Sequence, residues 1–270
     1  MKKMKEMKEM KSTKKHLRTS TSRLTVNRVE WFSGISDTVA EYSISLSTAI
    51  LFTVLIAGCG GTTQKEQELH VVTSIEEYRQ QVASDKAMEL IDLEEVIEDV
   101  RLDIRYATEN NFTGEVIYTK PKAYVRKPVG EALKRVHDSL EVHGLGVLVY
   151  DAYRPYSATV RFYEVYPDTV FVANPKYGSK HNRGCAVDVS LFDRATGDEM
   201  LMPTEFDEFS ERAHHEYMNL PEEAINNRAL LTGVMMHFGF TPYPSEWWHF
   251  DFTGWQNYPL MNISFEDLEK

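Results

Sequence analysis

Cysteine is nearly absent from this chain of 270 residues, which has only Cys59 and Cys185. Structural zinc sites are commonly closed by several cysteines, so two are too few for such a site. If Cys59 is modified, Cys185 is the only other thiol and no disulfide can form within the chain. We expect Cys185 to be a small buried residue, because strand alternation places it on the core face.

Positive charge is scarce beyond the N-terminal region. Residues 1–58 hold ten Lys and Arg against five Asp and Glu. The remainder holds 20 basic and 36 acidic residues, a net charge of −16, and the whole chain has a formal net charge of −11. Nucleic-acid phosphates need a basic footprint, so this composition argues against a nucleic-acid partner.

The chain also lacks an apolar run long enough to cross a membrane. The run from Ile44 to Ala57 is shorter than the roughly 20 residues that a spanning helix needs. It follows a Lys-rich start, ends in Leu55-Ile56-Ala57-Gly58-Cys59, and resembles a bacterial lipoprotein signal. The resemblance implies a lipid on Cys59 that holds the protein to a membrane, in the cell envelope and facing outside the cytoplasm. The alternative interpretation of the run is a buried core helix.

The length suits one sizeable domain with extensions. We expect a lipoprotein-type signal segment over residues 1–58 and a polar tether over 59–86, which passes into a short helix near Ile75 to Val82. The main domain would then occupy 87–270. No internal repeat is found.

Helices and strands alternate irregularly in the main domain. Apolar periodicity predicts helices over Glu131–Val142 and Ala229–Phe238, closed by Gly144 and Gly239, and strands over Leu145–Tyr150, Cys185–Leu191 and Trp248–Phe252. Without a regular βαβ order, this mixture favours an α+β fold with a small mixed or antiparallel sheet and flanking helices.

Two short stretches have the composition of a catalytic zinc site. Residues 179–188, Ser-Lys-His-Asn-Arg-Gly-Cys-Ala-Val-Asp, and 246–249, Glu-Trp-Trp-His, supply His181, Asp188 and His249 as candidate ligands. Catalytic zinc usually takes three such ligands and leaves one position for water. Glu246 is left over as a base, because three residues before His249 it can reach that water in an extended or turning segment. Taken singly, each residue is more often an ordinary polar group.

Strand geometry supports the convergence of these ligands and places the zinc site at the sheet. Cys185, Val187 and Val189 alternate on one strand face, so Asp188 falls on the other, toward which His181 can enter from the turn at Gly184. Arg154 follows an apolar strand at the start of a loop, a common place for catalytic groups. There it could share negative charge developing on a scissile oxygen, although a surface salt bridge is the simpler interpretation.

Five separated segments, in order, resemble the VanX-type D-alanyl-D-alanine dipeptidases, zinc peptidases related to D,D-carboxypeptidases. They span most of residues 90–260 and are Asp103 to Thr108 with Asn111 to Gly114, Tyr150 to Pro155, Ser179 to Asp188, Phe206-Asp207 with Glu211 to His215, and Glu246 to His249.

The resemblance implies roles for individual residues. It implies that residues 87–270 are a zinc dipeptidase domain, with Zn²⁺ as cofactor and a small dipeptide as substrate. It also implies His181, Asp188 and His249 as zinc ligands. Glu246 matches the family's base and Arg154 its transition-state stabiliser. Positions lining the dipeptide pocket are matched by Tyr106, Ser179 and Asp207, with Asp207 as partner of the substrate ammonium.

Three functions remain open at this point. The first is hydrolysis of D-Ala-D-Ala to D-alanine, and the second is a D,D-carboxypeptidase or endopeptidase acting on peptidoglycan peptides of the cell wall. The third is a lipid-anchored wall-binding module without catalysis, for which Glu246 beside the metal would have no use. His214-His215 also suggests metal chemistry, but adjacent helical residues point about 100° apart, so we favour a structural role.

Overall fold

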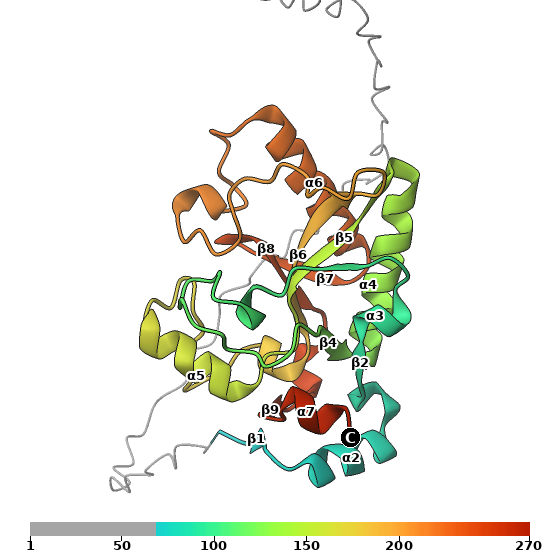
Figure 1. Ribbon diagram of the computed structural model, residues 1–270, viewed down its shortest axis with the longest axis vertical. Coiled ribbons are helices and arrows are strands. Elements are labelled where there is room, and N and C mark those ends of the chain that lie inside the picture. The colour runs from blue at the N-terminus through green and yellow to red at the C-terminus, as the bar shows by residue number, and fades with distance from the viewer. Residues whose placement is uncertain (1–68) are drawn as a thin grey trace, which may run out of the picture. The chain divides into compact units, whose positions relative to one another are not determined.

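A computed structural model describes residues 69–270; Cys59 and the apolar run before it lie outside this part. The described chain mixes short strands and helices without a regular alternation (Figure 1), which confirms the α+β class. The strands are β1 (Val71–Val72), β2 (Leu90–Asp92), β3 (Arg101–Leu102), β4 (Tyr124–Arg126), β5 (Leu145–Asp151), β6 (Ala186–Asp193), β7 (Phe240–Tyr243), β8 (Glu246–Phe252) and β9 (Leu260–Met261).

Helices of several lengths flank these strands. The α-helices are α2 (Ile75–Ser84), α3 (Leu93–Val96), α4 (Lys127–Leu140), α5 (Tyr156–Val165), α6 (Glu222–His237) and α7 (Phe265–Leu268). The 3-10 turns are η1 (Lys86–Met88), η2 (Arg105–Ala107), η3 (Glu141–His143), η4 (His181–Arg183), η5 (Glu211–Ala213) and η6 (Trp255–Asn257). Within residues 69–270, no helix has the length and apolar character needed to cross a membrane.

A five-stranded sheet in the order β3-β5-β6-β8-β7 forms the centre of the domain. β3 runs parallel to β5, and all other neighbours are antiparallel. All residues of β5, and those of β6 up to Phe192, are buried, because helices and loops cover both faces of these middle strands. β1 with β9 and β2 with β4 form two smaller sheets.

α4 and α6 show why the predicted helices form and where they end. α4 begins with Pro128 in its first turn, a position where the missing N–H costs nothing, and buries one apolar stripe against β5. Gly144, with φ of 71°, ends the following turn as predicted. α6 begins seven residues before the predicted start at Ala229, because its first turns are polar and acidic and carry no apolar period.

The segment before residue 87 packs onto the domain in its described part. Val72 is fully buried where β1 pairs with β9, and the Tyr78 hydroxyl accepts a hydrogen bond from the Leu90 amide at 2.7 Å. The boundaries at residues 58 and 86 stay predictions.

Candidate active site

β6 and the turn before it place the first two candidate ligands. His181 opens η4, and Gly184 then turns the chain into β6 with φ of 68°. A Cβ at Gly184 would lie 2.7 Å from Leu90 Cδ2, so glycine suits this position in both space and backbone conformation. The turn brings His181 Nε2 within 3.4 Å of Asp188 Oδ1, as the alternation of the strand predicted.

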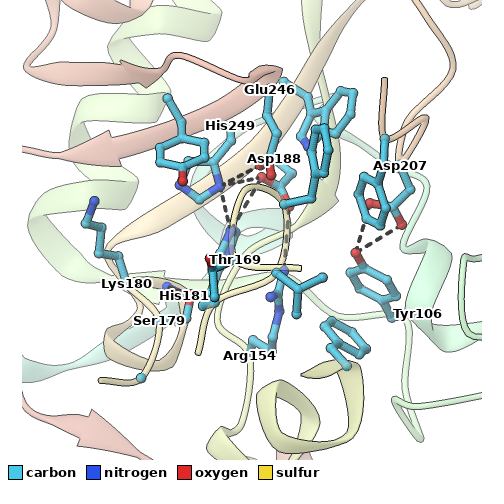
Figure 2. A pocket seen from close by; sticks show the side chains of 18 of the residues that line it. Tyr106, Arg154, Thr169, Ser179, Lys180, His181, Asp188, Asp207, Glu246 and His249 are labelled. Carbon is cyan, nitrogen blue, oxygen red and sulfur yellow. Dashed lines mark hydrogen bonds and ion pairs between the residues drawn. The ribbon is translucent and has the colours of Figure 1, made fainter. Parts of the chain in front are cut away.

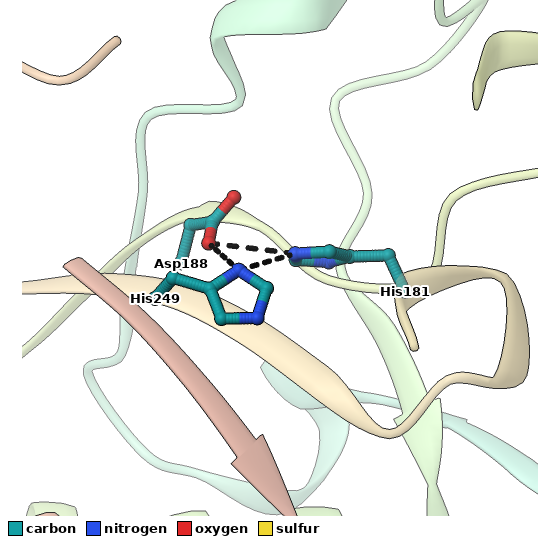
Figure 3. A group of neighbouring side chains, drawn as sticks. All are labelled: His181, Asp188 and His249. Carbon is teal, nitrogen blue, oxygen red and sulfur yellow. Dashed lines mark hydrogen bonds and ion pairs between the residues drawn. The ribbon is translucent and has the colours of Figure 1, made fainter. Parts of the chain in front are cut away.

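β8 supplies His249 from the neighbouring strand. Asp188 of β6 and His249 of β8 are register partners, and His249 Nδ1 lies 3.1 Å from Asp188 Oδ1. His249 Nδ1 also lies 3.2 Å from His181 Nε2. Three potential ligand atoms from η4, β6 and β8 therefore face one point (Figure 3). We call His181, Asp188 and His249 the metal group.

Partners outside the metal group determine which nitrogen of each histidine is free. His181 Nδ1 lies 2.7 Å from the carbonyl oxygen of Ala152, and His249 Nε2 lies 2.9 Å from Asp251 Oδ1. Each of these nitrogens therefore donates a proton when its imidazole is neutral, which leaves a lone pair on the nitrogen that faces Asp188. Lys180 Nζ, 2.5 Å from Asp251 Oδ2, in turn holds that carboxylate in place.

The metal group fits zinc. Zinc bonds to His nitrogen and carboxylate oxygen are about 2.0 to 2.2 Å long, so two ligands of a tetrahedral ion lie about 3.3 to 3.5 Å apart. The three observed separations, 3.1, 3.2 and 3.4 Å, are close to these values. Asp188 Oδ1 is buried without a well-aligned hydrogen bond, which is the state of an atom that a cation would satisfy.

The charge of Asp188 is favoured even without an ion. Burial alone would disfavour the carboxylate, but the adjacent His181 and His249 outweigh this effect and lower its pKa. A deprotonated carboxylate is the form that binds a metal.

A shift of register in β8 brings Glu246 to the same side as His249. Pro242 of β7 pairs with Phe250, and the next residue, Tyr243, pairs with Glu246. The three residues of β8 between these pairs, 247–249, therefore have no partner in β7. In a regular strand, residues three apart would face opposite sides, and the bulge removes this alternation. Glu246 Oε2 thus lies 3.6 Å from His249 Nδ1.

Glu246 has the opposite electrostatic character to Asp188. Glu246 is 6% exposed, and burial raises its pKa to about 8. The charge of His249 opposes this increase, whereas the charges of Asp188 and Asp207 add to it. A carboxyl group of this kind can exchange a proton near neutral pH.

Arg154 is held in the site by a buried carboxylate. Its Nε and one terminal nitrogen donate to Asp151 Oδ2 at 2.9 and 2.7 Å, and the guanidinium lies over the Phe162 ring with its carbon 4.7 Å from the centroid. Asp151 also accepts a hydrogen bond from the Tyr118 hydroxyl at 2.8 Å. The guanidinium comes within 3.8 Å of Asp188, so Arg154 is part of the site and not of a surface salt bridge.

Asp207 and Tyr106 form a separate polar pair. The Tyr106 hydroxyl lies 3.1 and 3.0 Å from the two carboxylate oxygens of Asp207. Asp207 has φ of 63°, a left-handed conformation that Asp adopts more readily than most residues. Burial, together with the charge of Asp188, raises the pKa of Asp207 well above its usual range. We call Asp207 and Tyr106 the Asp207 end.

Ser179 has a local structural role beside its place in the site. Its hydroxyl oxygen accepts a hydrogen bond from the His181 amide at 3.2 Å, and its own amide donates to the Asn182 side chain at 2.7 Å. These contacts shape the turn that presents His181.

A single cavity of about 310 Å³ gathers every candidate site residue (Figure 2). Its lining includes Tyr106, Arg154, Ser179, His181, Asp188, Asp207, Glu246 and His249. Four phenylalanines also line the cavity and form a series of ring contacts that starts at Tyr106: Phe162, Phe112, Phe209 and Phe171.

His214, His215 and Cys185 do not belong to this cavity lining. The His215 amide bonds to the Pro244 carbonyl at 3.0 Å, and its ring packs on Phe250, as expected of a structural residue. Burial lowers the pKa of His215 to about 4. Cys185 is fully buried, as predicted, and burial raises its pKa to about 12.

Three residues that contribute to the site were not predicted from the sequence. Asp151 binds Arg154, Asp251 binds His249, and Lys180 both binds Asp251 and lines the cavity. Asp151 had a signal in its spacing of three residues from Arg154. Lys180 and Asp251 are 71 residues apart, so no local pattern connects them.

Comparison with known proteins identifies the family of this chain. A family model described as D-ala-D-ala dipeptidase matches residues 86–266. The D-alanyl-D-alanine dipeptidase of Escherichia coli (strain K12) is 36% identical over 177 residues, which cover 66% of this chain and 91% of that protein. The D-alanyl-D-alanine dipeptidase of Enterococcus faecium is 31% identical over 178 residues, 58% of this chain and 88% of that protein.

A solved structure is also similar. The structure named "VanYB in complex with D-Alanine-D-Alanine" aligns with a TM-score of 0.34 and 15% identity, over 50% of this chain and 75% of that one. The family model covers well over half of the chain, and the resemblance found in the five motifs is confirmed. The chain belongs to the D-Ala-D-Ala dipeptidase family and is a zinc metallopeptidase.

Proposed function

We propose that the protein hydrolyses the dipeptide D-Ala-D-Ala to two molecules of D-alanine. The observation that carries this assignment is the cavity itself: the metal group, a carboxyl group able to exchange protons and a buried Asp207 line the same 310 Å³ space. The family and its dipeptidase relatives support the same substrate class.

His181, Asp188 and His249 would hold the zinc ion. Zinc in such a site supplies a Lewis acid that polarises a peptide carbonyl and makes water more acidic. The residues around the metal group carry the remaining steps.

Glu246 acts as the proton carrier in this mechanism. Its carboxylate takes a proton from the attacking water as the oxygen adds to the scissile carbonyl carbon. The protonated Glu246 then gives that proton to the nitrogen of the departing residue as the C–N bond breaks, so the carboxylate is regenerated. The raised pKa of Glu246 suits both transfers.

Arg154 stabilises the oxygen that becomes negative during this addition. Its guanidinium is fixed by Asp151 before substrate arrives, so it needs no reorganisation when charge develops. Asp207, supported by the Tyr106 hydroxyl, binds the free ammonium of the dipeptide. An acylated amino terminus lacks that charge, so we expect the enzyme to reject longer wall peptides.

The decisive experiment measures D-alanine release from D-Ala-D-Ala and from its N-acetylated form, with and without a chelator. We expect chelator-sensitive cleavage of the free dipeptide alone. Cleavage of the acetylated form would indicate a D,D-carboxypeptidase or endopeptidase acting on peptidoglycan. No cleavage of either by the zinc-loaded, folded protein would favour a binding module.

We further propose that the protein is a lipoprotein of the cell envelope, anchored through Cys59, and that it degrades dipeptides outside the cytoplasm. The support is the sequence pattern that ends at Cys59, which lies outside the described residues. Metabolic labelling with a fatty acid tests the anchor. The wild-type protein should carry the label and sediment with membranes, whereas Cys59→Ala should do neither.

A further inference from the structure

Cationic side chains line the end of the cavity that lies across the metal group from Asp207. Figure 2 shows Lys180 on one side of His181 and His249, and Asp207 with Tyr106 on the other. Arg183 also lines the cavity, and its guanidinium lies over the same Trp255 ring as the Lys180 ammonium, at 5.3 and 5.2 Å from the ring centre. The cavity therefore carries acidic and basic groups on opposite sides of the metal group.

Lys180 is held in place at this end and retains hydrogen-bonding capacity. Its ammonium lies 2.5 Å from Asp251 Oδ2 and 5.2 Å from the centre of the Trp255 ring. The side chain is 31% exposed, so a ligand in the cavity can reach it. An ammonium has three donors and Asp251 takes one, which leaves donors for a second anion.

The formal charges complete the contrast. Lys180 and Arg183 with Asp251 give the basic end a net charge of about +1, and a deprotonated Asp207 gives the opposite end about −1. A free dipeptide is a zwitterion, with its ammonium and its carboxylate on opposite sides of the scissile bond. The distribution of charge along the cavity matches that of such a ligand.

We infer that Lys180 is a specificity-determining residue that binds the C-terminal carboxylate of the substrate. This inference rests on the proposed dipeptidase function. With the ammonium at Asp207 and the peptide bond beside the metal group, a dipeptide directs its carboxylate to the Lys180 side. One extended residue spans about 3.5 Å, so the carboxylate lies about that far beyond the scissile bond, on the side where the Lys180 ammonium keeps free donors.

Ser179 supports the same subsite. Its hydroxyl oxygen accepts the His181 amide proton, so its own hydroxyl proton remains available to a carboxylate at this end of the cavity. Lys180 and Ser179 together would therefore recognise a free carboxylate and discriminate against a neutral carboxamide.

The test compares D-Ala-D-Ala with D-Ala-D-alaninamide, which lacks the terminal charge. For wild type, Lys180→Met and Lys180→Arg, the ratio of kcat/KM for the free acid to that for the amide is measured. We expect this ratio to fall at least tenfold in Lys180→Met, mainly through KM of the free acid, and to be largely restored in Lys180→Arg.

This ratio separates recognition from indirect damage. If Lys180 acted only through Asp251 on His249, the substitution would lower zinc content and impair both substrates equally, and the ratio would stay within twofold of wild type. That result would overturn the inference, as would a wild-type enzyme that cleaves the amide as well as the acid. Metal content is measured in parallel, and Lys134→Met on the surface of α4 is the matched charge control.

The outcomes also distinguish this inference from the proposed function. Wild-type cleavage of D-Ala-D-Ala with an unchanged ratio in Lys180→Met rejects the Lys180 subsite alone. Failure of the wild-type protein to cleave either dipeptide rejects the proposed function and the subsite together. If Lys180→Met does not fold, Lys180→Gln gives the same comparison.

Discussion

The metal group and the Asp207 end line the same cavity but are built on different parts of the fold. Asp188 and His249 are register partners on two central strands, and each histidine has a second, fixed partner. Asp207 lies on a loop in a left-handed conformation, and its hydrogen-bond donor, Tyr106, comes from the short turn η2. Chemistry is thus placed on the rigid sheet and substrate recognition on loops.

The two carboxylates at these ends also differ in their electrostatics. Burial disfavours the charged form of both carboxylates. The neighbouring histidines outweigh this effect and lower the pKa of Asp188, whereas burial and the charge of Asp188 raise the pKa of Asp207. Asp188 is therefore ready to bind a metal ion, and Asp207 becomes favourably charged only when a cation comes close. An ammonium at Asp207 would supply that cation.

Asp188→Asn should remove a ligand from the metal group, and we expect the largest effect from this substitution. The amide is a weaker, uncharged ligand, so zinc content should fall steeply and kcat/KM by roughly 10⁴-fold or more. Metal analysis of the purified variant, alongside its turnover of D-Ala-D-Ala, checks the prediction. A variant with full zinc content would show that Asp188 is not a ligand.

Glu246→Gln should separate chemistry from metal binding. The amide keeps the shape of the side chain but cannot carry a proton, so kcat should fall about 10² to 10⁴-fold, the usual contribution of a general base. Zinc content should match the wild type, because Glu246 lies outside the metal group. Normal turnover in this variant would remove Glu246 from the mechanism.

The metal group could be predicted from the sequence because local rules govern it. Strand alternation alone places Asp188 on the face of β6 opposite to that of Val187 and Val189. The turn at Gly184 brings His181 close to the Asp188 face. The reach of Glu246 was predicted from a spacing of three residues, but the shift of register that produces it depends on pairing with β7, a strand that carries little apolar signal.

The supporting contacts could not be predicted in this way. The hydrogen bond from Lys180 to Asp251 connects the residue before η4 to β8. Tyr106 donates a hydrogen bond to Asp207, which lies 101 residues further along the chain. Such contacts arise from tertiary packing, which the periodicity and spacing of residues do not predict. For Tyr106 and Asp207, family resemblance supplied the pair, and the structure adds the hydrogen bonds between them.

Asp207→Asn would test the recognition side of the comparison. Loss of a charged partner for the substrate ammonium should lower kcat/KM by about 10 to 100-fold, through KM, since a hydrogen bond to a charged group contributes about 1.5 to 3 kcal/mol. Zinc content should not change, in contrast to Asp188→Asn. A selective loss of zinc in Asp207→Asn would contradict the division between the two ends.

Tyr106→Phe should give the smallest effect and show how Asp207 is held. The substitution removes only the hydroxyl that bonds to both carboxylate oxygens and keeps the ring packed on Phe162. We expect KM to rise about three- to tenfold with little change in kcat, because a typical hydrogen bond within a protein contributes about 0.5 to 1.5 kcal/mol. In the Asp207→Asn background the same substitution should have a much weaker effect, since its target charge is gone. Full additivity in this double-mutant cycle, measured on D-Ala-D-Ala, would mean that Tyr106 contacts the substrate independently of Asp207.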